Sequence, residues 1–194
     1  MGPTRSPLWR YGRLLLAALL TVVPAGVTAE EPAAAALSRD DLVAAAREVM
    51  DAARLCALVT IDQAGLPWAR TMDPFPPDDD MVVWLGTNPR SRKVEQIRAN
   101  PHVVLYYSDP ERMAYVTIAG TARLVEDPEA KARRWKDEWA GFYPDREHGY
   151  LLIQVTPDRL EVFSAAHGIE GDPRTWAPPS VRFDHAAGGT RPPG

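Results

Sequence analysis

Between residues 55 and 163 the chain alternates short apolar, β-branched runs with turn-forming residues, which is the pattern of an antiparallel sheet. Residues 73–80 are too rich in proline and aspartate for a helix or a central strand and predict a surface loop. Thr156-Pro-Asp158 separates the last two runs. Five to seven strands with few helices predict a mainly β fold, a small barrel with flanking helices. The expected strands are 55–61, 66–72, 81–87, 102–108, 113–125, 150–155 and 159–163.

Two segments before and between these strands have helical signals. Ser38-Arg-Asp-Asp41 has the form of a capping box, with a hydroxyl residue followed by acids in the first turn. In residues 88–100, Asn88 can cap a helix, Pro89 suits its first position, and Asn100-Pro101 ends it. The first helix presents an apolar face made of Leu42, Val43, Ala46, Val49 and Met50.

The first thirty residues predict a targeting segment. Arg5, Arg10 and Arg13 precede an apolar run over 14–23, and Val27-Thr28-Ala29 offers the small residues of a signal-peptidase site. The run is about half the ~20 residues that a membrane span needs, so no stable membrane anchor is expected, with an uncleaved anchor as the alternative. The predicted organisation is a signal peptide over 1–29, a linker over 30–37, one domain over 38–168 and an irregular tail over 169–194. The chain is therefore expected to be exported, to the periplasm or beyond.

Composition narrows the classes of function. The net charge of −4 becomes −7 once the three leader arginines are removed, which argues against nucleic acid as a partner. Cys56 is the single cysteine, so the chain can form neither an intrachain disulfide nor a cysteine zinc cluster. It lies in an apolar strand, which favours a buried structural thiol over a nucleophile.

The start of the expected helix over 88–100 is unusually basic. Arg90, Arg92 and Lys93 lie in its first turn, where the helix dipole disfavours cations by roughly 0.3–1 kcal/mol each. A bound dianion explains the arrangement, because free amides, the hydroxyls of Thr87 and Ser91 and the positive side chains all suit a phosphate. A solvated basic turn that pairs with nearby acids is the alternative.

Three motifs in this region resemble one known family. Residues 87–105 match the flavin-phosphate segment T-N-x-x-S-R-K-x-x-Q-I-x-x-N-P-x-V-x-L of the pyridoxamine 5′-phosphate oxidase family without a gap. Residues 65–72 resemble its G-x-P-x-x-R-x-M strand. Residues 116–124 resemble its V-x-I-x-G-x-A-x-x-L strand, with Leu124 one position before the final leucine of that pattern. The resemblance implies an FMN-binding split barrel, which is an antiparallel, Greek-key-like barrel of six strands, in a homodimer whose subunits close the flavin site together.

The resemblance also implies roles for residues of this chain. Arg70, Ser91, Arg92 and Lys93 are expected to hold the FMN phosphate. Thr71 and Met72 are expected to run beside the ribityl chain and ring, and Trp84, Leu85 and Thr87 to line the isoalloxazine. Deazaflavin and haem are the alternative cofactors, because related split barrels accept them.

The resemblance ends before the carboxyl terminus. Pyridoxamine phosphate oxidases carry a Trp followed by Arg and His residues that grip the substrate phosphate, whereas residues 160–167 here read LEVFSAAH. The chain is therefore similar to the general-stress-protein-like branch, and vitamin B6 oxidation is not expected. An FMN-dependent oxidoreductase is the first hypothesis, and a non-catalytic flavin- or haem-binding protein is the second. No catalytic acid, base or nucleophile is assigned, and no metal site is expected.

The other candidate residues have plainer interpretations. The four histidines are scattered without metal-ligand spacing; His102 is expected to be a packed or edge residue, and His167 is an alternative haem ligand. Residues 78–80 are expected to form a solvated acidic loop. A third helix is expected over 127–140, with Trp135, Trp139 and Phe142 on one stripe that predicts its core face. Contact of this stripe with a partner chain's flavin is the alternative.

Overall fold

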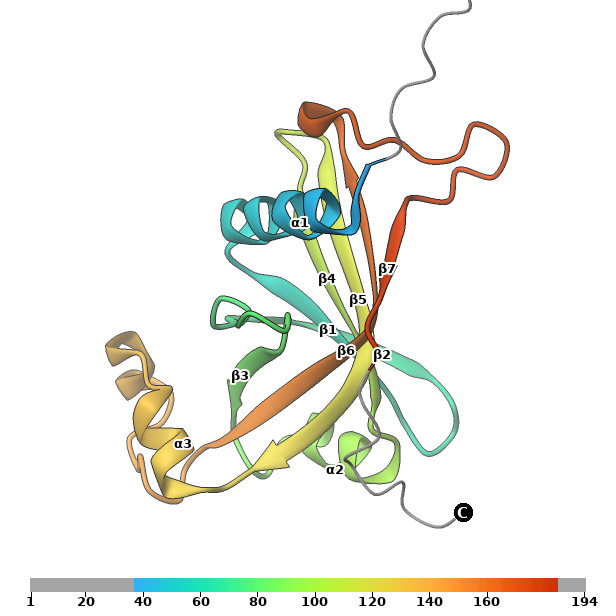
Figure 1. Ribbon diagram of the computed structural model, residues 1–194. Helices are drawn as coiled ribbons and strands as arrows, with labels where there is room; N and C mark the ends of the chain where they lie inside the picture. The colour runs from blue at the N-terminus through green and yellow to red at the C-terminus, as the bar shows by residue number, and fades with distance from the viewer. Residues whose placement is uncertain (1–36, 185–194) are drawn as a thin grey trace, which may run out of the picture. The chain divides into compact units, whose positions relative to one another are not determined.

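The computed structural model describes residues 37–184 as a strongly curved antiparallel sheet with helices at its ends and side (Figure 1). The predicted signal peptide, most of the predicted linker and the last ten residues lie outside the described residues. Among residues 37–184, no helix is both long and apolar enough to cross a bilayer. The helices are α1 (Arg39–Ala53), α2 (Arg92–Ala99), α3 (Pro128–Arg133) and the 3₁₀ helices η1 (Asp137–Gly141) and η2 (Ala165–His167). The strands are β1 (Cys56–Ile61), β2 (Pro67–Met72), β3 (Val83–Thr87), β4 (His102–Asp109), β5 (Ala114–Val125), β6 (Leu151–Ser164) and β7 (Ser180–Arg182).

Six strands follow one another in the order β2-β1-β4-β5-β6-β3, and β7 pairs with β6. The two ends of this order meet only where Pro74 bridges Leu85 and the Phe75 amide donates to the Trp84 carbonyl at 2.9 Å. The sheet is therefore barrel-like but split between β2 and β3. This confirms the predicted mainly β, split-barrel class.

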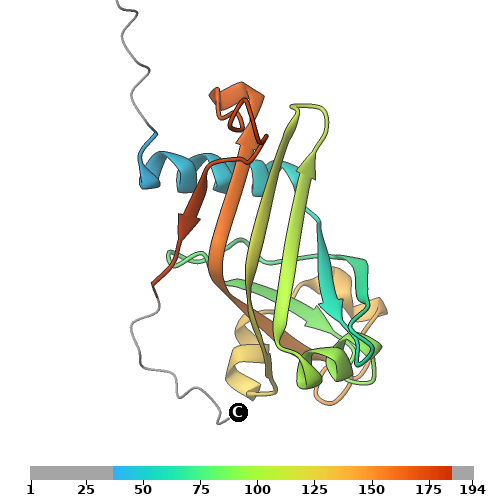
Figure 2. The same ribbon diagram turned by 90° about the vertical axis from the view of Figure 1, so that its right-hand side faces the viewer.

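The core follows from the alternation of the strands. Along β5 every second residue from Ala114 to Ala122 is buried, and the residues between them face outward. The inward residues pack with the apolar face of α1, whose capping box at Ser38 is present as predicted. Helices α1 and α2 lie at opposite ends of the barrel (Figures 1 and 2).

Several predicted elements have different boundaries. The helix expected over 88–100 begins at Arg92 with Ser91 as its N-cap residue, because the Asn88 side chain instead accepts from the Arg90 amide in a local turn. The last two expected strands form one strand, β6. A bulge opposite Gly120 accommodates the proline at 157 without ending the strand. Strand β7 lies in the segment expected to be irregular.

The helix expected over 127–140 is also wrong in extent. It ends at Arg133, and the chain resumes as η1. As a result the expected aromatic stripe splits: Trp139 is buried, Trp135 is half-buried and Phe142 is 77% exposed. Trp139 packs on Trp135, Tyr143 and Tyr150 in a second apolar cluster, at the side of the barrel next to β3 and β6.

Candidate functional site

Side chains from three elements meet at the α2 end of the split. Upstream of the Pro74–Leu85 bridge, β2 is paired only with β1, and downstream of it β3 is paired only with β6. Arg70 lies on β2 and Thr87 ends β3, while Ser91 and Lys93 open α2. The barrel split thus has cations and hydroxyls along its two edges.

Arg70 is held by a buried polar network. Its Nη1 donates to Thr60 Oγ1 at 2.6 Å and to the Leu58 carbonyl at 3.1 Å, while Nη2 donates to Gln96 Oε1 at 3.0 Å. Thr60 is fully buried on β1 and donates in turn to the Gln96 oxygen at 2.6 Å. These contacts fix one edge of the guanidinium group and leave its charge without a carboxylate.

The hydroxyl side of the cluster centres on Thr87. Lys93 Nζ donates to Thr87 Oγ1 at 3.0 Å, and Ser91 Oγ lies 3.2 Å from the same oxygen. The Ser91 side chain does not cap α2, so the first amides of the helix keep their donor capacity. Thr87 is 1% exposed, which makes this a buried anchor for the lysine.

Arg92 is positioned separately, at the surface. Its guanidinium carbon lies 4.7 Å from the centre of the Trp68 ring, a cation–π contact. The Trp68 indole nitrogen donates to Asp62 Oδ2 at 2.8 Å, which orients the ring. Arg92 therefore adds an exposed positive charge close to Arg70. The cation cluster consists of Arg70, Arg92 and Lys93 together with Thr87 and Ser91.

The three cations repel one another. Burial lowers the pKa of Arg70, and the charge of Arg92 lowers it further. Burial likewise lowers the pKa of Lys93, followed by the charge of Arg70. Among residues 37–184, Arg70, Arg92 and Lys93 form no ion pair. An arrangement that concentrates positive charge without a carboxylate favours an anion.

The remaining predicted site residues lie elsewhere around the split. Thr71 faces outward, whereas Met72 and Leu85 are buried in the barrel core. Trp84 packs in the second cluster, with the Arg134 guanidinium carbon 3.8 Å from its ring centre. Its buried indole nitrogen has no hydrogen-bond partner. The described contacts therefore bring together the residues expected to hold the phosphate, and they place Thr87 among them rather than with Trp84 and Leu85.

Sequence reasoning missed the supports of this cluster. Gln96 occupies the glutamine of the motif matched over 87–105, and that position was the available signal. Thr60 and Asp62 carried no local signal, because their roles arise from the pairing of β1 with β2.

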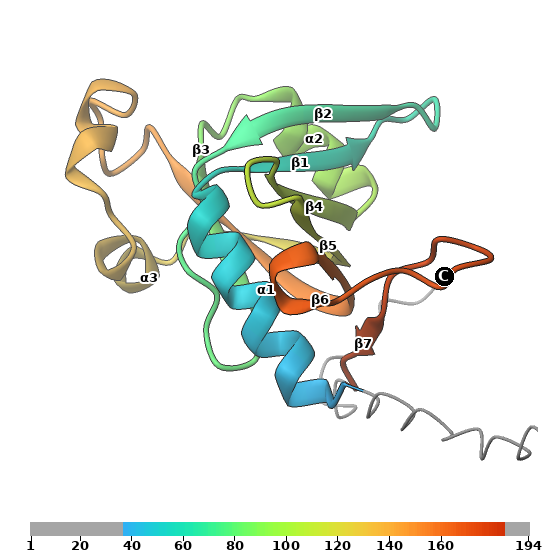
Figure 3. The same cartoon turned by 90° about the horizontal axis from the view of Figure 1, so that it is seen from above.

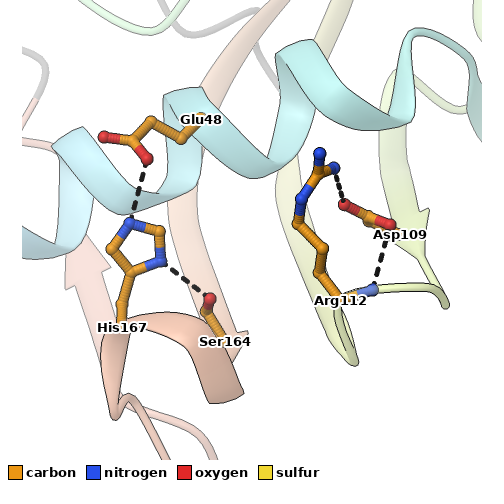
Figure 4. A network of polar contacts seen from close by, with 5 residues as sticks. All are labelled: Glu48, Asp109, Arg112, Ser164 and His167. Atoms are coloured by element: carbon orange, nitrogen blue, oxygen red, sulfur yellow. Dashed lines mark hydrogen bonds and ion pairs between the residues drawn. The ribbon is translucent and has the colours of Figure 1, made fainter.

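Cys56 and His167 lie outside the cluster. Burial raises the pKa of the Cys56 thiol to about 12, so it is protonated at neutral pH and suits the core. His167 joins the end of β6 to α1 (Figure 4): Nδ1 lies 2.8 Å from Ser164 Oγ, and Nε2 lies 3.0 Å from Glu48 Oε2. Both ring nitrogens are thus engaged, next to the Asp109–Arg112 ion pair.

Comparison with known proteins decides the family. Residues 42–164 match the sequence model of the pyridoxamine 5′-phosphate oxidase family. The chain belongs to this family. General stress protein 26 of Bacillus subtilis is 27% identical over 134 residues, which cover 66% of this chain and 93% of that protein.

Solved structures share the family's fold. A Clostridium acetobutylicum protein related to general stress protein 26 has a TM-score of 0.62 at 19% identity, covering 76% of this chain and 97% of that one. A Nostoc punctiforme FMN-binding protein related to pyridoxamine 5′-phosphate oxidase has a TM-score of 0.55 at 17% identity. The match covers 77% of this chain and 99% of that one. A heme-binding protein of Mycobacterium smegmatis has a TM-score of 0.56 at 19% identity. The match covers 75% of this chain and 60% of that one. Proteins with this fold thus include both FMN- and haem-binding proteins.

Proposed function

We propose that this chain is an FMN-binding flavoprotein that holds the flavin phosphate with Arg70, Ser91, Arg92 and Lys93. The observation that carries the proposal is the gathering of three cations and two hydroxyls at one opening of the barrel without a carboxylate partner. A phosphate dianion satisfies all of these groups at once. It also relieves the mutual repulsion that lowers the pKa values of Arg70 and Lys93.

The reaction class proposed is oxidoreduction. A bound flavin supplies hydride or electron transfer, and the protein supplies binding and orientation. In this chain Arg70 is pre-positioned by Thr60 and Gln96, and Lys93 by Thr87, so the phosphate-binding groups need little rearrangement on binding.

Haem is the second candidate, because a heme-binding protein shares the fold. His167 is the candidate ligand that the sequence offers. Both of its nitrogens already have partners, so ligation requires that either Ser164 or Glu48 give up its hydrogen bond. The cation cluster has no equivalent obstacle, and flavin is therefore favoured.

Absorption of the purified chain is the first test. We expect flavin bands near those of FMN; a Soret band indicates haem instead, and deazaflavin is recognised by its own shorter-wavelength band. FMN is expected to bind more tightly than riboflavin, which has no phosphate, by at least about tenfold for each charge-assisted hydrogen bond that the phosphate accepts.

A pair of double variants tests the residues. Arg92→Ala with Lys93→Ala is expected to lose FMN binding, measured by flavin fluorescence, while circular dichroism remains that of the folded protein. Arg98→Ala with Arg174→Ala removes the same charge from exposed positions outside the cluster and is the control. Undiminished FMN binding in the first variant, or an equal decrease in both, contradicts the assignment.

A further inference from the structure

Two uncharged side chains, Thr60 and Gln96, hold Arg70 in one orientation. Arg70 Nη1 donates to Thr60 Oγ1 at 2.6 Å, and Nη2 donates to Gln96 Oε1 at 3.0 Å. The Thr60 hydroxyl donates in turn to the same Gln96 oxygen at 2.6 Å. Thr60 is fully buried and Gln96 is 8% exposed, so water competes little for these contacts. The three side chains therefore form a closed triangle of hydrogen bonds.

The donors fix the direction of every bond in this triangle. A guanidinium group can only donate, so both oxygens that it contacts must accept. Thr60 Oγ1 then keeps its single proton for Gln96 Oε1. The Gln96 side chain must present its oxygen to both partners, because the opposite amide orientation would place N–H groups against Arg70. The amide thus has one orientation that satisfies all of these contacts.

Arg70 keeps two donors for a ligand. A guanidinium group has five N–H donors. Both on Nη1 are used, by Thr60 and by the Leu58 carbonyl at 3.1 Å, and one on Nη2 is used by Gln96. The Nε–H and the second Nη2–H remain, on one edge of the group. No buried, unpartnered side-chain atom among residues 37–184 belongs to Arg70, so its Nε is open to solvent. Two parallel donors on one edge match two oxygens of a phosphate.

The neutrality of Gln96 preserves the charge of this edge. A glutamate at the same position has the oxygens to accept both hydrogen bonds, but its carboxylate would cancel the charge of Arg70 and repel an anion. Among residues 37–184, Arg70 forms no ion pair. The amide therefore holds the guanidinium group by hydrogen bonds alone and leaves its positive charge available to a ligand.

We propose that Thr60 and Gln96 are positioning residues that give the cation cluster its preference for a phosphate-bearing ligand. They turn the free edge of Arg70 towards the ligand, and the neutral Gln96 leaves the charge of that edge uncancelled. The inference rests on the proposed function, because it requires that a flavin phosphate meet Arg70. Its consequence is selective: changes at either position weaken the binding of FMN, and not that of riboflavin, which lacks the phosphate.

An amide-to-carboxylate exchange tests the role of charge. Fluorescence titration measures the dissociation constants of FMN and riboflavin. Gln96→Glu is expected to weaken FMN binding about tenfold or more and to change riboflavin binding by less than about twofold. Gln154→Glu is the matched control, because Gln154 Oε1 also accepts from an arginine, Arg123, at 2.6 Å but outside the cation cluster; both affinities should stay unchanged. Equal effects of the two variants, or a parallel loss of FMN and riboflavin in Gln96→Glu, overturn the proposal.

Thr60 offers a second test that leaves the charge unchanged. Thr60→Val keeps the shape of the side chain and removes its hydroxyl, so FMN binding should weaken about three- to tenfold. Thr60→Ser restores a hydroxyl and should recover most of the affinity, with the circular dichroism of each variant that of the folded protein. Unchanged FMN binding in Thr60→Val, or no recovery in Thr60→Ser, overturns the positioning role while the proposed function stands. An unmodified chain that binds FMN no more tightly than riboflavin overturns the proposed function and this inference together.

Discussion

At the scale of single residues, Lys93 illustrates how the proposed anion site lowers the stability of the ligand-free protein. Its ammonium is partly buried beside Arg70 without a carboxylate, and its pKa is lowered. A basic group whose pKa is lower in the folded than in the unfolded chain opposes folding while it is charged. Stability then rises as the pH increases from the lowered value towards the ordinary 10.5, because the unfolded chain binds more protons in that window.

Lys93→Met is therefore expected to stabilise the flavin-free protein at neutral pH. The gain should not exceed about 1 kcal/mol, because solvent screens a partly exposed charge. The measurement is urea unfolding with no phosphate present, and the advantage should shrink near about pH 10. Arg98→Met, at an exposed position of the same helix, is the control and should not stabilise. A less stable Lys93→Met protein means that the Thr87 hydrogen bond outweighs the repulsion.

At the scale of elements, the bulge in β6 depends on one glycine. Gly120 pairs with Pro157 while Ala119 pairs with Arg159, so the pairing skips one residue of β6. A Cβ at Gly120 would lie 2.2 Å from the Thr156 carbonyl oxygen, which is backbone and cannot move independently. The close approach of the strands thus requires glycine at this position.

Gly120→Ala is expected to lower the free energy of unfolding by about 2–3 kcal/mol, measured by urea denaturation. Gly141→Ala is the control, because a Cβ there meets nothing within 4 Å; its effect should stay within about 0.5 kcal/mol. If the two variants are equally stable, the strands can separate at the bulge more easily than their pairing indicates.

The same bulge shows what sequence could and could not predict about elements. Alternation placed the strands well, since one face of each packs in the core. The sequence predicted a break in β6 at Pro157, whereas the strand continues through a bulge. A bulge depends on the partner strand, which local sequence does not reveal. Likewise the motif over 87–105 named Arg92 and Lys93, but not that Thr60 and Gln96 fix Arg70, because that contact depends on β1 pairing with β2.

At the scale of the whole described domain, β2 and the loop after it connect the two ends of the barrel. Arg70 on β2 contacts Gln96 of α2, and the loop is tied to α1 where Arg47 donates to the Pro77 carbonyl at 2.9 Å. Seen from above, α1 crosses the barrel opposite α2 and covers β4, β5 and β6 on their inner side (Figure 3). Their outer face is left uncovered by any helix of the described residues (Figure 2).

We propose that this outer face forms the interface of the homodimer that the family resemblance implies. Tyr106, Tyr115 and Phe163 form a ladder across it, with ring centres 5.8 and 5.6 Å apart, and Tyr106 is 41% exposed. Adjacent aromatic rings on a solvent-facing sheet are typical of an interface centre.

We therefore expect the purified chain to sediment as a dimer. Tyr115→Asp is expected to weaken association about 30-fold or more, because it buries an unpaired carboxylate at the centre of the interface. Leu66→Asp introduces the same charge in the β1–β2 turn and should remain dimeric. If subunits also share the flavin site, the Tyr115→Asp monomer should retain its circular dichroism and lose FMN. A monomeric unmodified chain, or a Tyr115→Asp protein that stays dimeric, contradicts assembly through this face and leaves the cation cluster to bind its anion within one subunit.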